Sequence, residues 1–140
     1  MIDIFFFATK YYNLTMKEVT AIQKDDLTAG PSTPGIKRDF AFKDDGVLVI
    51  RSITEPGIVS GWHRHGDYHV HGYMAKGSML LEFGPGGKES VLVQEAGFFH
   101  VPPHTTHRET NPSKTEGQEI ILFLTGKGDL VQNLESPEND

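Results

Sequence analysis

All seven histidines of the chain fall within one stretch of 45 residues, from position 63 to position 107. Two of them are spaced two apart, in the run Gly61-Trp62-His63-Arg64-His65. Because alternate residues of a β-strand point to the same face, His63 and His65 are expected to project together. Two imidazoles placed in this way can bind one metal ion at about 2.0–2.1 Å. Gly61 shares that face, and its missing side chain leaves room for a metal or a substrate.

A second cluster lies downstream, where Pro102 and Pro103 end one predicted strand and His107 begins the next. A neighbouring strand could therefore bring His107 to the first pair. Glu109 follows two residues later and shares the face of His107, which makes it a candidate for a carboxylate behind the ligands or a general base. The alternative is that Glu109 is a rim charge paired with Arg108 or a lysine.

The elements that must position these side chains are predicted to be short β-strands. The chain has 140 residues, with 15 Gly and 8 Pro, and shows no sustained helical periodicity. Residues 16–27 could hold one or two helical turns, and residues 28–35 read as a loop. Strands are expected around 40–42 and over 47–55, 58–65, 68–75, 77–83, 89–94, 98–101, 105–110 and 118–125. Strands at a spacing of about ten residues predict an all-β sandwich or barrel.

Composition excludes several classes of protein. The net charge is −6, without a basic stripe, so nucleic acid is not an expected partner. There are no cysteines, so disulfides and thiolate metal sites are excluded and any metal must be held by nitrogen and oxygen. The apolar run from Ile4 to Ala8 is too short to span a membrane and lacks a preceding basic region. We therefore expect a cytoplasmic protein with no membrane partner.

Two regions are predicted. Residues 1–27 form an amino-terminal arm or edge strand, dense in aromatic residues over its first twelve positions, and could be exchanged between subunits. Another interpretation is that residues 1–15 precede a natural start at Met16. Residues 28–140 form one barrel domain with a short acidic tail. Because exposed sheet edges invite pairing, a homodimer is expected.

Residues 40–125 resemble the cupin superfamily. The first cupin motif is matched by Gly57, His63-x-His65 and Gly77, and the second by Gly97, Pro102, His107 and Asn111. The resemblance implies a double-stranded β-helix (jelly-roll) barrel with a metal inside it.

The chain departs from the cupin pattern where the first motif has its glutamate ligand. Counting forward from His65 places His69 there, whereas counting back from Gly77 places Val70 there, and His71 is adjacent. The expected ligands are therefore His63, His65, His107 and His69, with His71 as the alternative to His69. If Val70 fills the position, three ligands remain. His104 stands where the second motif has a turn glycine, and His100 is expected to point outward or to be a satisfied structural residue.

A thiolate-free imidazole site suits one divalent transition metal per chain, namely Fe, Mn, Ni, Cu or Zn. Three or four protein ligands leave positions open for a substrate, which is typical of a catalytic site. The resemblance implies a metal-dependent, dioxygenase-like enzyme acting on a small organic molecule. In such an enzyme we expect Glu109 or Tyr73 to handle protons. The alternative is a non-catalytic cupin that binds or senses a small metabolite or a metal.

Overall fold

The computed structural model describes residues 18–137. The predictions for the aromatic arm over residues 1–15, for a start at Met16 and for the acidic end at Glu138 and Asp140 lie outside these residues. Within residues 18–137, no helix is long and apolar enough to cross a membrane.

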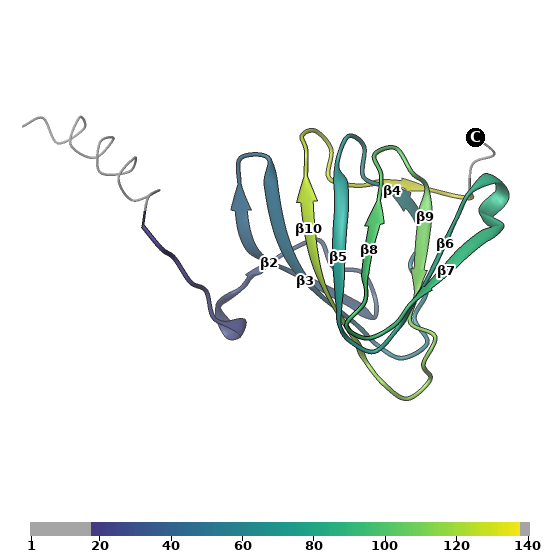
Figure 1. The fold of residues 1–140 in the computed structure, drawn as a ribbon, viewed down its shortest axis with the longest axis horizontal. Coiled ribbons are helices and arrows are strands. Elements are labelled where there is room, and N and C mark those ends of the chain that lie inside the picture. The colour runs from purple at the N-terminus through teal and green to yellow at the C-terminus, as the bar shows by residue number, and fades with distance from the viewer. Residues whose placement is uncertain (1–17, 138–140) are drawn as a thin grey trace, which may run out of the picture.

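Two antiparallel sheets make up the barrel (Figure 1). The six-stranded sheet has the order β1-β2-β3-β10-β5-β8, and the five-stranded sheet has the order β11-β4-β9-β6-β7. The strands of the first sheet are β1 (Thr28–Ala29), β2 (Ile36–Asp44), β3 (Val47–Thr54), β10 (Gln118–Thr125), β5 (His69–Lys76) and β8 (Phe98–Val101). Those of the second are β11 (Gln132–Leu134), β4 (Trp62–Arg64), β9 (His107–Thr110), β6 (Met79–Phe83) and β7 (Glu89–Val93). Two short 3-10 helices, η1 (Lys24–Asp26) and η2 (Pro85–Gly87), complete the described elements.

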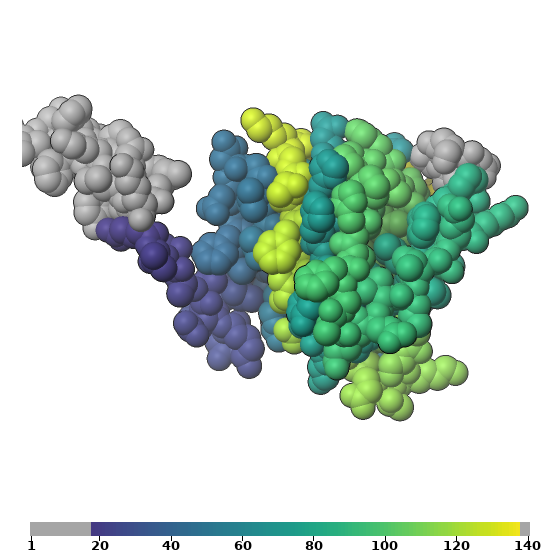
Figure 2. Space-filling model, in the orientation of Figure 1, coloured from purple at the N-terminus to yellow at the C-terminus, as the bar shows by residue number. Residues whose placement is uncertain are grey.

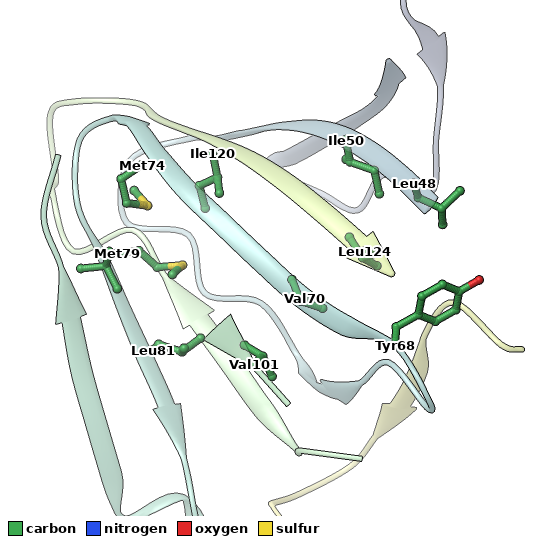
Figure 3. Packing of buried hydrophobic residues seen from close by; sticks show 11 residues of the cluster. Leu48, Ile50, Tyr68, Val70, Met74, Met79, Leu81, Val101, Ile120 and Leu124 are labelled. Atoms are coloured by element: carbon green, nitrogen blue, oxygen red, sulfur yellow. The ribbon is translucent and has the colours of Figure 1, made fainter. Parts of the chain in front are cut away.

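The core forms where the inner faces of the two sheets meet (Figure 3). Strand β3 alternates between buried and partly exposed residues, as expected of a strand with one face on a core. Its buried Leu48 and Ile50 pack with Val70 and Met74 of β5, and Leu81 of β6 closes the cluster from the other sheet. Burying such side chains stabilises the fold by about 1.5–3 kcal/mol each.

The prediction of an all-β double-stranded β-helix is confirmed, with differences at four elements. Strand β2 begins at Ile36, earlier than expected, and a two-residue strand β1 occurs in the predicted loop over 28–35. The predicted strand 58–65 is regular only at Trp62–Arg64, although residues 58–60 hydrogen-bond to residues 109–111. Strand β11 was not predicted.

Candidate metal centre

Three histidines converge on the inner side of the five-stranded sheet. His63 of β4 is the pairing partner of His107 of β9, and His65 follows just after β4 ends. One ring nitrogen from each of the three lies within 4.8 Å of the others. His63 and His107 are 7% and 1% exposed. The structure therefore brings together the three histidines that the spacing singled out.

Each imidazole is oriented by a backbone carbonyl that lies next to its Nδ1 atom. The Nδ1 atoms of His63, His65 and His107 lie 2.7, 2.9 and 2.9 Å from the carbonyl oxygens of Gly61, Leu130 and Thr105. A carbonyl can only accept, so each Nδ1 carries the proton and donates it. Each Nε2 is thereby left as the metal-binding nitrogen, and its ring is held in place.

The surroundings of the Nε2 atom of His107 fit a bound cation. It is buried and has no hydrogen-bond partner among the described residues. Oε1 of Glu109 lies 3.4 Å from this atom and 3.5 Å from Nε2 of His63. Two ligands on bonds of about 2.1 Å at a tetrahedral angle are separated by about 3.4 Å. The carboxylate and the two imidazoles therefore already have the spacing of ligands around one ion.

The charges in this group favour ligation at neutral pH. Burial, reinforced by the neighbouring His63 and His107, lowers the pKa of His65 to about 4, which keeps this ring neutral. Burial opposes the charged form of His63, but the Glu109 carboxylate outweighs it and raises the pKa of His63 above its ordinary value. Burial likewise opposes ionisation of Glu109, yet His63 and His107 together hold the pKa of that carboxyl well below its ordinary value.

Glu109 is closer to the centre than a purely supporting carboxylate would be. The alternative of a rim charge paired with Arg108 does not hold, because Arg108 instead donates to Glu82 at 2.9 Å and stacks over the Trp62 ring. The side chain of Glu109 is 24% exposed and touches both imidazoles. Glu109 thus brings a carboxylate to this group of histidines, and it comes from β9, the strand that also carries His107.

His69 and His71 do not join this group, which corrects the expectation that either would be the fourth ligand. Both lie on β5, where the inward residues are Val70, Gly72 and Met74, so the histidines point to the outer face of the six-stranded sheet. Strands β10, β5 and β8 lie side by side in this sheet (Figure 2). Val70 is buried in the core and cannot ligate either.

The outward histidines form a separate cluster with His100 of β8. The His100 ring is stacked with those of His71 and His69, with centroids 4.5 and 5.2 Å away. Nδ1 of His69 lies 2.9 Å from Nε2 of His100. The prediction that His100 points outward matches its position. Some burial and the nearby His71 and His69 lower the pKa of His100.

Tyr73 is also remote from the converging histidines, which corrects its proposed role in proton handling. Like His69 and His71, Tyr73 points to the outer face of β5. It packs there against the exposed Phe98, with ring centroids 4.9 Å apart. Of the two proton-handling candidates, only Glu109 is at the centre.

Other motif residues shape the surroundings. A side chain added at Gly61 would meet nothing within 4 Å, so there is open space at that position. Buried Asn111 donates to the carbonyls of Thr54, Glu55 and Glu116 and fastens the loop after β9. His104 has a φ of +56°, so it adopts the left-handed conformation that favours glycine.

Sequence reasoning missed one charged residue near the centre, Arg38 of β2. It lines a small interior cavity together with Glu109. Burial lowers the pKa of Arg38, and Glu109 partly offsets that effect. The one signal in the sequence was strand alternation, because Arg38 lies two residues from Ile36 and from Phe40 and so shares their face of β2.

Comparison with known proteins supports the fold. No family model and no curated sequence matches the chain. Among solved structures, KdgF from Halomonas sp. is similar, with a TM-score of 0.64 and 20% identity over 79% of this chain and 96% of that one. The polyketide cyclase RemF from Streptomyces resistomycificus has a TM-score of 0.70 and 15% identity, over 87% of this chain and 89% of that one. An RmlC-like cupin from Shewanella frigidimarina has a TM-score of 0.64 and 15% identity, over 79% and 93%. The chain has the fold of these cupins.

Proposed function

We propose that the chain is a metal-dependent enzyme that acts on a small organic molecule, with His63, His65, His107 and Glu109 as the ligands of one divalent transition metal. The observation that carries the proposal is the fixed orientation of three imidazoles whose ring nitrogens lie within 4.8 Å of one another, two of them beside the Glu109 carboxylate. A structural metal site is closed by its four ligands, whereas this one borders two cavities, one lined by His107 and the other by Glu109.

The protein's own residues would bind and orient the reacting molecule. A bound transition metal would supply Lewis acidity, or redox reactivity toward dioxygen if the metal is redox-active. Glu109 and the three histidines would hold it, and the carbonyls behind the rings would keep the Nε2 atoms aimed at it. An oxygenase-type reaction is the first to test. Solved neighbours include an oxalate oxidase, at 22% identity over 76% of this chain and 60% of that one.

The test is elemental analysis of the protein purified without added metal, followed by oxygen uptake with a panel of phenols, diketones and keto acids. We expect about one transition metal per chain in the native protein. His63→Ala and His107→Ala should lose it while keeping the β-sheet circular dichroism spectrum. His69→Ala and His71→Ala, on the outer face, are the matched controls and should keep it.

Full metal content in both His63→Ala and His107→Ala would show that the assignment is wrong. Metal binding without turnover of any compound in the panel would favour a non-catalytic binding protein instead. A small-molecule ligand and a homodimer remain predictions, and sedimentation equilibrium would test the dimer.

A further inference from the structure

Two cavities border the candidate metal centre, one lined by His107 and the other by Glu109, and Phe99 of β8 lines both of them. The larger one has a volume of about 430 Å³ and opens at the seam between β7 and β8, the end strands of the two sheets. Its walls are largely apolar and include Leu81, Val91 and Val101, and His107 forms part of its lining. This volume lies in the ordinary range of small-molecule sites.

The smaller cavity, of about 30 Å³, is polar on one side. Its polar lining consists of Arg38, Ser52, Thr54, Glu109, Asn111 and Gln118. A volume of this size holds about one small group, such as a water molecule or a carboxylate. The site as a whole therefore has a roomy apolar part and a small polar part, and both border Phe99.

Arg38 is the one cation among the residues that line the two cavities. Its Nη1 atom donates to the carbonyl of Pro31 and to Oγ1 of Thr33, at 3.1 and 3.2 Å. Its Nε and Nη2 atoms have no hydrogen-bond partner among the described residues. The Nε–Nη2 edge of a guanidinium is one of the edges that bind a carboxylate through two parallel hydrogen bonds. Arg38 is thus anchored at one end and available at the other.

The charge of the loaded site calls for an anion. A divalent cation and Arg38 contribute three positive charges, the Glu109 carboxylate removes one, and the three histidines are neutral as ligands. No other Asp, Glu, Lys or Arg lines either cavity. Two positive charges would remain in a partly buried space, where uncompensated charge is costly.

From these features, and resting on the proposed function, we infer that the substrate is an organic acid with a hydrophobic or aromatic body. Its carboxylate pairs with Arg38, and its body occupies the apolar pocket between β7 and β8. A two-carbon or three-carbon acid would pair with Arg38 but would leave the apolar pocket unused. A neutral aromatic molecule would fill the pocket but would leave Arg38 without its anion.

Three probes that share an α-dicarbonyl group separate these requirements. Phenylpyruvate has both the acid and the ring, pyruvate has the acid alone, and 1-phenyl-1,2-propanedione has the ring alone. Calorimetric titrations of metal-loaded and metal-free protein should show phenylpyruvate binding at least about tenfold more tightly than either of the others. Equal affinity of the wild type for phenylpyruvate and the diketone would overturn the inference without any variant.

Variants then assign the preference to residues. Arg38→Met should weaken phenylpyruvate binding at least about tenfold and leave diketone binding unchanged. Val91→Asn should weaken both ring compounds and spare pyruvate. Lys37→Met is the matched control, because Lys37 is the next residue on β2 and its side chain is 73% exposed. An unchanged affinity in Arg38→Met, or an equal loss in Lys37→Met, would contradict the role of Arg38.

Arg38→Met also removes the hydrogen bonds to Pro31 and Thr33, and this loss could prevent the variant from folding. Arg38→Lys is therefore the second variant to measure. Lysine keeps the charge but not the planar fork, and weaker phenylpyruvate binding with unchanged diketone binding is expected. Unchanged phenylpyruvate binding in Arg38→Lys would count against the two-bond contact. A native protein without metal would refute the proposed function, whereas the same comparison on metal-free protein would still test Arg38.

Discussion

His63 and His107 are directly paired across β4 and β9, and their ring centroids are 4.3 Å apart. Two of the proposed ligands are therefore one cross-strand pair of a sheet, and their separation is set by strand geometry rather than by a mobile loop. His65, two residues beyond His63, comes to the same face by the alternation of extended chain. The centre is thus part of the sheet framework of the barrel.

The first prediction concerns the carboxylate. Glu109→Gln keeps the shape of the side chain but removes its charge, so it should weaken metal binding at least about tenfold. Competition with a chromophoric chelator at neutral pH measures the affinity. Glu82→Gln is the control, because Glu82 lies on the adjacent β6 and is paired with Arg108. Unchanged affinity in Glu109→Gln would remove Glu109 from the ligand set and leave it as a candidate base.

The second prediction is a loss of stability of the metal-free protein in acid. Burial lowers the pKa of His65 to about 4 from an ordinary value of 6.5. Between these values the unfolded chain binds a proton that the folded chain does not, so the free energy of unfolding falls as the pH falls. His65 alone contributes at most about 3 kcal/mol to this change.

His63 and Glu109 change stability with pH as well. The raised pKa of His63 adds stability that is present below pH 6.5 and is lost as the pH rises through the folded value. The lowered pKa of Glu109 adds stability that is lost as the pH falls below 4.5. Urea denaturation from pH 7 to pH 4 should therefore be compared between the wild type and His65→Gln. A loss just as steep in the variant would exclude His65 as its source.

The third prediction contrasts two glycines. A methyl group at Gly72 of β5 would collide with the Phe99 ring, which lies against that backbone. Gly72→Ala should cost about 1–3 kcal/mol and displace the ring that lines both cavities. Gly61→Ala meets nothing within 4 Å and should stay within about 0.5 kcal/mol of the wild type. Thermal and urea denaturation would measure the stability of both variants. Equal changes in the free energy of unfolding would show that the contact of Phe99 with Gly72 does not exclude a side chain there.

The fourth prediction concerns the motif asparagine. Asn111 is 1% exposed and its amide donates to three backbone carbonyls. Asn111→Ala would leave these groups without a partner and should lower the free energy of unfolding by about 2–4 kcal/mol. Asn133→Ala, at an exposed position of β11, is the control and should have little effect. A stability loss below about 1 kcal/mol in Asn111→Ala would mean that the loop does not depend on this side chain.

Much of the fold could be predicted from the sequence because alternation and turn residues are local signals. Val47–Thr54 shows the period of a half-buried strand, and Asp45-Gly46 forms the hairpin turn that the pair predicts. Strand β11 lacks such a signal, because it is three residues long and mostly exposed. It pairs with β4, and the nearby Leu130 carbonyl orients His65, so a part of the centre depends on a segment that the pattern does not mark.

Only the parts of the site that follow from the alternation of side chains along one strand were predictable. His63 with His65, and His107 with Glu109, could be grouped because each pair is two residues apart on extended chain. His69 failed because its position along the motif says nothing about which face of β5 it occupies, and Val70 and Met74 take the inner face. Arg38 could not be assigned because its nearness to Glu109 arises from the packing of two different sheets.

The outer-face cluster of His69, His71 and His100 has a practical consequence for biochemical work. Exposed imidazoles gathered on neighbouring strands are the groups that immobilised nickel or cobalt resins retain, so we expect such a resin to retain the untagged chain. Metal leached from such a resin would load this cluster and inflate the apparent stoichiometry. Purification by ion exchange and gel filtration therefore avoids this error when the metal content of the inner site is measured.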